Sequence, residues 1–313
     1  MLLRFLYLVG LAIGASSLLA LLGGSYWAFD LFSHFRVQYV VLLIFFSGLL
    51  GFFKQTRQAG VIGSFAAFNL FLIAPLFLAN SAHDGASLER SKLRVMSINL
   101  LSSNHEIEAV SRAVYAAKPK VVIFLEVNEW WHQELDAHLL STYPFHESVP
   151  REDNFGISIY SQIPFTELQE VNLGSDVPSL LASFEYEETP FHLFAVHLLP
   201  PFGKRGTELR NAAFAQIPAT IANLPHELLL VGDLNATPWS FPFRRLLAET
   251  ALLDSSQGYG LQPTWPSFST LLSIPIDHCL HTKGIVIVHR EVGDDIGSDH
   301  FPLIVDFQLR TAQ

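Results

Sequence analysis

Cysteine is almost absent from this 313-residue sequence, which contains a single one, Cys279. One cysteine excludes an intrachain disulfide, so cysteine usage does not indicate the redox compartment of the protein. It also excludes a zinc site built from a cysteine cluster. Cys279 lies in the apolar run from Ile274 to Leu280, and we interpret it as a small core residue.

Basic residues are also scarce, with 19 Lys and Arg against 29 Asp and Glu. Residues 1–80 hold four of the bases and one of the acids, so residues 81–313 keep 15 bases and 28 acids, a net charge of −13. A surface this acidic opposes non-specific binding to a polyanion. It also lacks the basic stripe that is expected of a protein that binds duplex DNA.

The first 80 residues have few charges of either sign. Their composition accounts for the overall hydrophobic content of 50% and the mean hydropathy of +0.32, values that favour a membrane portion. Three apolar stretches are expected to form transmembrane helices near residues 5–29, 37–53 and 61–78. A cleaved signal peptide would explain the first stretch but not the two that follow it.

The positions of the few bases predict how these helices are oriented. Arg4 and the loop with Lys54 and Arg57 fall on one side of the membrane, and Asp30 and Arg36 fall on the other. The positive-inside rule places the first side in the cytoplasm. We therefore expect a multi-pass protein of the plasma or bacterial inner membrane. Its N-terminus would be cytoplasmic and its C-terminal part extracytoplasmic, which in a bacterium means periplasmic.

The sequence divides into a transmembrane region of residues 1–80, a polar linker of residues 81–91 and a globular domain of residues 92–313. Apolar, β-rich runs predict seven strands in this domain. The predicted strands are Leu93–Ile98, Val121–Leu125, Phe155–Tyr160, Phe191–Val196, Leu228–Val231, Ile274–Leu280 and Leu303–Phe307. Amphipathic patterns between them predict helices, the first with Ser103 and Glu106 at capping-box spacing. Strands mixed with helices indicate a layered domain of the α/β or α+β class.

Polar side chains lie at the ends of several of these apolar strands or, for Asp277, inside one. They are Asn99, Glu126, His197, Asp233, Asn235, Asp277, Asp299 and His300. Each one alone has a structural interpretation, because an Asp or Asn after a strand is commonly a turn or a cap, and a single His is commonly structural. Strand ends can bring side chains together without disrupting the core, so we interpret their recurrence as a candidate active site.

The order of these residues resembles the endonuclease/exonuclease/phosphatase superfamily, of which the chain would be a membrane-anchored bacterial member. The motifs VGDLNATP and GSDHFPL carry most of the resemblance, and FLEV and DNFGISIYS support it. The resemblance extends from Leu93 to Phe307. It implies a four-layer sandwich of two mixed β-sheets flanked by helices, with the site at one edge. It also implies metal-dependent hydrolysis of phosphate esters.

The resemblance implies a metal side of the site. Glu126, Asn99 and Asp299 match metal-side residues, and oxygen donors of this kind suit Mg²⁺ or Mn²⁺. Asn154, in DNFGISIYS, matches a residue that contacts the phosphate or supports His300. An Asx-turn before the strand is the structural alternative for Asn154.

The remaining residues match catalytic groups of the superfamily. Asp233 would orient or deprotonate the attacking water, and Asn235 would hold that water or a phosphate oxygen. His197 and His300 would contact the scissile phosphate, with His300 acting as an acid or stabilising charge. Asp277 would fix the tautomer of His300 and raise its pKa.

Neither the motifs nor the composition identifies the phosphate ester. Membrane anchoring favours a lipid headgroup or another small phosphodiester, and nuclease activity on extracytoplasmic nucleic acid is the second alternative. A catalytically silent, membrane-held binding module is the third, and the retention of all the motif residues disfavours it. Nothing in the sequence indicates an obligate protein partner.

Overall fold

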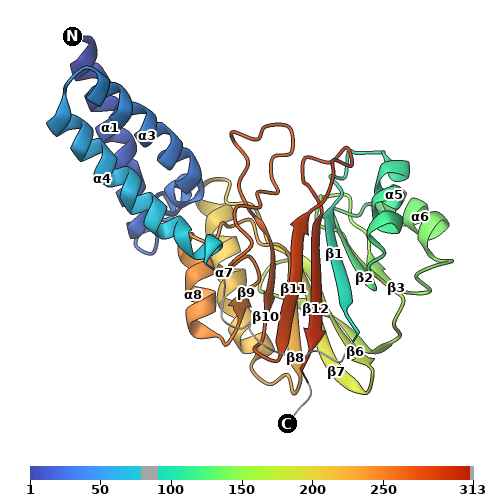
Figure 1. Cartoon of the computed structure of the whole chain (residues 1–313). Coiled ribbons are helices and arrows are strands. Elements are labelled where there is room, and N and C mark those ends of the chain that lie inside the picture. The colour runs from blue at the N-terminus through green and yellow to red at the C-terminus, as the bar shows by residue number, and fades with distance from the viewer. Residues whose placement is uncertain (79–90, 311–313) are drawn as a thin grey trace.

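The computed structural model describes residues 1–78 and 91–310. These residues form a bundle of apolar helices and a β-sandwich, and the bundle projects from one side of the sandwich (Figure 1). The predicted linker, residues 81–91, lies outside the described residues except for Ser91.

Three helices in the described part of the N-terminal region are long and apolar enough to cross a membrane, over Leu2–Leu22, Trp27–Phe52 and Thr56–Phe77. The region consists of α1 (Leu2–Leu19), η1 (Ala20–Leu22), α2 (Trp27–Leu31), η2 (Phe32–Phe35), α3 (Arg36–Phe52), α4 (Thr56–Ile73) and η3 (Ala74–Phe77). The first span ends at Leu22 rather than near residue 29, because two glycines follow and weaken the helix.

Within the described residues, twelve strands form two six-stranded mixed sheets, which confirms the predicted fold class. Their orders are β11-β12-β1-β2-β4-β3 and β5-β6-β7-β8-β10-β9. The strands are β1 (Leu93–Asn99), β2 (Val121–Leu125), β3 (Phe145–Val149), β4 (Ile157–Ser161), β5 (Phe165–Asn172), β6 (Pro178–Tyr186), β7 (Thr189–His197), β8 (Glu227–Asp233), β9 (Leu253–Asp254), β10 (Asp277–His281), β11 (Ile285–Val292) and β12 (Leu303–Leu309). Each of the seven predicted strands overlaps one of these.

Helices cover the outer face of each sheet and complete the four layers. They are α5 (Ile107–Ala117), α6 (Glu129–Leu139), α7 (Gly203–Ile221) and α8 (Phe241–Glu249). Along β1, Val95 belongs to the core between the two sheets, whereas Met96 packs with residues of α5 and α6. Successive side chains of a strand point to opposite faces of its sheet, and at β1 both faces are buried. Residues of α7 and α8 pack on the outer face of the second sheet.

The predicted capping box at the start of α5 does not form. Glu106 occupies the N-cap position without a side-chain cap bond. Its backbone N–H donates to Asn104 Oδ1 at 3.0 Å, so Asn104 takes the donor that the Ser103 hydroxyl would have needed.

The register of the strands brings polar residues to one edge of the sandwich. β1 and β2 are parallel, so that Asn99 and Glu126 lie at neighbouring strand ends. β7 and β8 are also parallel and end together, with His197 opposite Asp233. β10 runs antiparallel to β8, and its first residue, Asp277, also lies opposite Asp233. Strand ends from both sheets therefore supply one site.

Buried polar contacts join the helical bundle to the sandwich. Asp30, in α2, pairs with Arg210 of α7 at 2.7 Å, and neither side chain is exposed. The other carboxylate oxygen of Asp30 accepts the backbone N–H of Phe241 at 2.7 Å. Near the end of α4, the indole of Trp239 donates to the carbonyl oxygen of Leu72 at 3.0 Å. These contacts join residues that are far apart in the chain, and they hold the bundle against the sandwich.

Candidate active site

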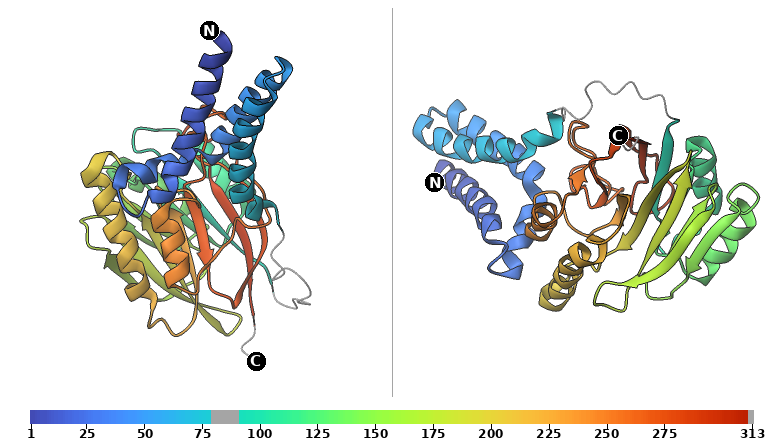
Figure 2. Two further views of the ribbon diagram at one scale, coloured as in Figure 1. Left: turned by 90° about the vertical axis from the view of Figure 1, so that its left-hand side faces the viewer. Right: turned by 90° about the horizontal axis from the view of Figure 1, so that it is seen from below.

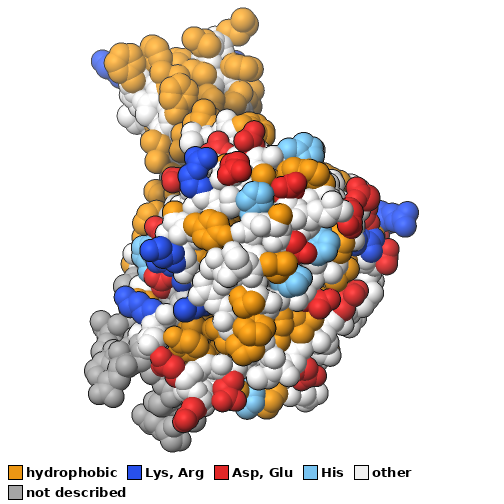
Figure 3. Space-filling view, turned by 90° about the vertical axis from the view of Figure 1, so that its right-hand side faces the viewer, with side chains coloured by type: hydrophobic (Ala, Val, Ile, Leu, Met, Phe, Trp, Pro, Cys, Tyr) orange, Lys and Arg blue, Asp and Glu red, His pale blue; other side chains and the backbone are white. Residues whose placement is uncertain are grey.

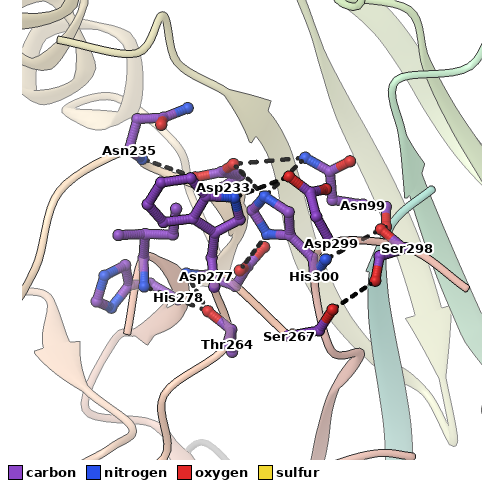
Figure 4. A network of polar contacts seen from close by, with 12 residues as sticks. Asn99, Asp233, Asn235, Thr264, Ser267, Asp277, His278, Ser298, Asp299 and His300 are labelled. Carbon is purple, nitrogen blue, oxygen red and sulfur yellow. Dashed lines mark hydrogen bonds and ion pairs between the residues drawn. The ribbon is translucent and has the colours of Figure 1, made fainter. Parts of the chain in front are cut away.

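The nine predicted site residues lie together at one edge of the sandwich, around a cleft of about 640 Å³. The residues among them that line the cleft are Glu126, Asn154, His197, Asp233, Asn235, Asp299 and His300. Asn99 and Asp277 are hydrogen-bonded to members of this set (Figure 4).

His300 and Asp277 form a buried pair in the cluster. The Nδ1 of His300 lies 2.9 Å from Oδ2 of Asp277, so Nδ1–H donates to the carboxylate. The Nε2 of His300 then faces Asp233, whose Oδ2 is 3.8 Å away. The hydroxyl of Ser298 accepts the backbone N–H of His300 and donates to the carbonyl oxygen of Asn99. These contacts hold the imidazole in one tautomer and one orientation.

The carboxylates around His300 raise its pKa by more than its burial lowers it. Burial lowers the pKa of His300, but three neighbouring carboxylates, led by Asp277, raise it to about 9. For Asp277 the two effects are reversed. Burial raises its pKa, but His300 lowers it below its ordinary value. At neutral pH the pair is therefore an imidazolium and a carboxylate.

Asp233 lies between two histidines. Its Oδ2 is 3.8 Å from the Nε2 of both His197 and His300, and its Oδ1 accepts the backbone N–H of Asn235 at 2.7 Å. Burial, and then the charge of Asp277, raise the pKa of Asp233 well above its ordinary value. A carboxylate with a raised pKa is a better proton acceptor than an exposed one.

His197 differs from His300 in its charge. Burial, and then the charge of His300, lower the pKa of His197 to about 3, so this imidazole is neutral. Its Nδ1 is buried and has no hydrogen-bond partner among the described residues. A neutral ring both donates and accepts a hydrogen bond, which suits a group that positions a ligand oxygen without adding charge.

Hydrogen bonds orient both carboxylate oxygens of Glu126. Its Oε1 accepts from Nδ2 of Asn99 and its Oε2 from the backbone N–H of Ser102, each at 3.1 Å. Burial raises the pKa of Glu126, although these bonds lower it. The hydroxyl of Ser102 also donates to Oδ1 of Asn154. The Asn154 side chain thus braces the loop around Ser102, and its contact with phosphate stays a prediction.

Asp299 presents one unpaired carboxylate oxygen. Its Oδ2 accepts from the indole N–H of Trp265 at 2.9 Å. Its Oδ1 is buried and has no partner among the residues that the structure describes. A buried oxygen of this kind is unfavourable without a donor or a cation. Trp265 also lines the cleft, and it was not assigned from the sequence because neither a motif nor a strand end marks it.

Four residues that line the cleft have a left-handed backbone. The φ angle is 58° at Leu101, 60° at Glu126, 68° at Asn154 and 48° at Asn235. Asn adopts this conformation readily, whereas for other L-residues it costs about 1–2 kcal/mol. Such strain persists only where the surroundings enforce it and is concentrated at functional sites.

One wall of the cleft comes from the N-terminal helical region. Leu31, His34 and Phe35, from α2 and η2, line it together with residues of the sandwich. No motif or pattern predicted these three, because their place in the cleft depends on how the helical bundle packs on the sandwich.

A model of the endonuclease/exonuclease/phosphatase family matches residues 96–300, a segment that contains all nine predicted site residues. The chain belongs to this family. No curated protein matches the sequence significantly. As a member of this family, the chain is an enzyme, a metal-dependent hydrolase that acts on phosphate esters.

Solved structures of the endonuclease/exonuclease/phosphatase family share the fold of the sandwich. A humanized D. rerio TDP2 gives a TM-score of 0.60 at 16% identity, over 70% of this chain and 100% of its own. A family protein from Beutenbergia cavernae gives 0.58 at 19% identity, over 71% and 73%. D. rerio TDP2 in complex with a single-strand DNA product gives 0.59 at 16% identity, over 70% and 100%. At these identities the likeness establishes the fold alone.

A divalent metal, as the family generally uses, fits the chemistry of this site. Asp233, Asp277 and His300 each present a ligand atom within 4.8 Å of the others. Glu126 and Asp299 add carboxylate oxygens, and the described residues that line the cleft include no Lys or Arg to balance them. An excess of oxygen donors over bases is typical of a site for a hard cation.

Proposed function

We propose that the protein is a membrane-anchored phosphoester hydrolase that uses Mg²⁺ or Mn²⁺ and activates water for attack on phosphorus. The convergence around Asn99 carries this proposal. The Nδ2 of Asn99 lies 3.1 Å from Glu126 Oε1 and 3.5 Å from both Asp233 Oδ2 and His300 Nε2. A carboxylate for a metal, a carboxylate for water and a cationic donor are the groups that this chemistry needs.

We assign the metal to Glu126, Asn99 and Asp299. When bound, the cation would neutralise the charge that develops on the phosphate oxygens. The unpaired Oδ1 of Asp299 supports this assignment, as does the fixed orientation of both Glu126 oxygens. Asp277 is the poorer ligand, because its charge is already paired with the imidazolium of His300, whereas the donors to Glu126 are neutral.

We assign Asp233 to orient the attacking water and to accept its proton, in keeping with its raised pKa. The amide nitrogen of Asn235 donates to a backbone carbonyl at 2.8 Å, which leaves its Oδ1 for the water. His300, held as a cation by Asp277, donates from Nε2 to a phosphate or leaving-group oxygen. The neutral His197 adds a second hydrogen bond to the phosphate.

Hydrolysis of bis-p-nitrophenyl phosphate by the purified chain in detergent tests this function. We expect release of p-nitrophenol with Mg²⁺ or Mn²⁺, a loss of at least about a hundredfold with EDTA, and recovery when metal is restored. EDTA that is already saturated with Mg²⁺ is the control. A rate that EDTA leaves unchanged would contradict the metal assignment, and no hydrolysis with either metal would contradict the function.

We propose that the bundle anchors the enzyme with its sandwich outside the cytoplasm. The N-terminus and the α3–α4 turn lie at the end of the bundle remote from the sandwich (Figure 1), so Arg4 and Lys54 are at that end. The positive-inside rule favours a cytoplasmic location for it. In a bacterial host, protease added to spheroplasts should then digest the sandwich, and protection until lysis would reverse the orientation.

A nuclease is the second candidate, because one structural neighbour, D. rerio TDP2, was solved with a single-strand DNA product. The net charge of −13 of residues 81–313 opposes a nuclease function, since tight binding of a polyanion depends on Lys and Arg side chains. DNA, RNA and lipid phosphoesters compared at one salt concentration would separate the two. The retention of all nine predicted residues in one cleft opposes a catalytically silent binding module.

A further inference from the structure

Residues 27–35 contribute a wall to the cleft although they precede the segment that matches the family, residues 96–300. They form α2 and η2. Of the three side chains that they place in the cleft, Leu31 and Phe35 are apolar and His34 is the exception. The membrane region is therefore part of the substrate site as well as an anchor.

Buried contacts fix this wall to the catalytic groups. The Nδ1 of His34 lies 3.2 Å from the hydroxyl of Thr237, two residues beyond Asn235. Asp30, the residue before Leu31, forms the fully buried ion pair with Arg210. Both contacts are buried, and breaking either would leave a buried polar group without its partner, so they hold the wall in place.

Other residues that line the cleft are apolar as well. Pro200, Pro201 and Phe202 line it, and Phe202 is 79% exposed. A second loop presents Leu271, which is also 79% exposed, and Gln38 of α3 donates to its carbonyl oxygen at 3.1 Å. Large apolar side chains exposed to solvent, such as Phe202 in the cleft and Leu271 beside α3, mark a surface that meets another apolar phase.

The cleft and the helical bundle lie toward the same end of the sandwich. The bundle projects away from the sandwich near the end where β12 begins (Figures 1 and 2). This end of the sandwich carries the site. Apolar side chains cover the bundle, whereas acids, bases and histidines are spread over the sandwich (Figure 3). A bilayer around the bundle would therefore have its surface close to the apolar side chains of the cleft.

We infer that the enzyme takes its substrate from the bilayer, and that this substrate is a phosphoester lipid. The inference rests on the proposed phosphoesterase function. The hydrocarbon of the lipid would lie against Leu31, Phe35 and Phe202, while its phosphate reaches His300 and Asp233. Apolar contact stabilises a bound hydrocarbon chain. It does not stabilise the phosphate backbone of a nucleic acid, whose binding depends on Lys and Arg side chains.

Two phosphodiesters that differ only in their alkyl chain test this inference. They are methyl and decyl p-nitrophenyl phosphate, the second kept below its micellar concentration, with the chain held in amphipol so that no free detergent competes. We expect kcat/KM to be at least about tenfold higher for the decyl ester, since burial of two methylene groups gives roughly this factor. In Phe35→Ala and in Phe202→Ala, the ratio of the two values should fall at least about threefold.

The matched control is Phe52→Ala. Phe52 is 79% exposed, like Phe202, but ends α3 at the remote end of the bundle, so its replacement should keep the ratio. Equal values for the two esters would overturn the lipid inference and leave the phosphoesterase function standing. Hydrolysis of neither ester would overturn both. An equal fall for both esters in Phe35→Ala and Phe202→Ala would reduce the wall to a structural role and also overturn it.

Discussion

Replacing His300 with alanine is expected to lower kcat for bis-p-nitrophenyl phosphate at least about a hundredfold. The carboxylates around His300 raise its pKa to about 9, so at neutral pH it is the cationic donor of the cleft. A charge that interacts more strongly with the transition state than with the substrate acts on kcat rather than on KM. Steady-state kinetics at saturating Mg²⁺ provide the measurement.

Two further variants separate the chemical role of His300 from a structural one. Asp277→Asn keeps the volume of its partner but removes the charge that maintains the imidazolium, so kcat should also fall. His289→Ala removes an imidazole of β11 that is 48% exposed and should keep the rate of the unmodified enzyme. A folded His300→Ala variant with kcat within tenfold of that rate would refute the assignment.

All seven strands that the sequence predicts have two neighbours in their sheet. Four of the five that it misses, β3, β5, β9 and β11, lie at sheet edges. An edge strand has one exposed side and carries more polar residues, as in Phe165–Asn172, so its pattern resembles a loop. The fifth, β6, is central, but Pro178, Ser179 and Ser183 interrupt its apolar run.

The N-terminal helical region shows a different limit of sequence analysis. Composition alone predicts three apolar helices, because about twenty apolar residues are a strong local signal. The sequence predicts a loop between spans at Asp30, whereas the structure has Asp30 in α2 and buries it against Arg210, 180 residues away. No local pattern encodes such a pairing, and the contribution of Phe35 to the cleft depends on it.

Strand ends made most of the candidate site predictable. Asn99, Glu126, His197 and Asp233 end or follow parallel strands, and parallel neighbours that end together bring their last side chains together. Trp265 reaches the same cleft from an irregular segment, where periodicity carries no information about direction.

Glu126→Gln is expected to raise the Mg²⁺ concentration for half-maximal rate at least about tenfold and to lower kcat at least about a hundredfold. Glutamine keeps the volume and one carbonyl oxygen, so the bond from the Ser102 backbone can persist, whereas its amide nitrogen cannot accept from Nδ2 of Asn99. The negative charge is lost, and a neutral amide oxygen holds a hard dication less strongly than a carboxylate does. Rates measured across a Mg²⁺ titration give both quantities.

The backbone conformation at Glu126 is expected to persist in this variant. Its φ of 60° is enforced by the surrounding contacts, and glutamine neither adds to nor relieves that strain, so the melting temperature should stay within a few degrees. Glu129→Gln, at an exposed acid three residues later, should keep the Mg²⁺ dependence of the unmodified enzyme. An unchanged dependence in Glu126→Gln would instead place the metal among Asp233, Asp277 and His300. In that case His300 would hold the metal through Nε2 while Nδ1–H still donates to Asp277, and Nε2 would no longer be free to donate a proton.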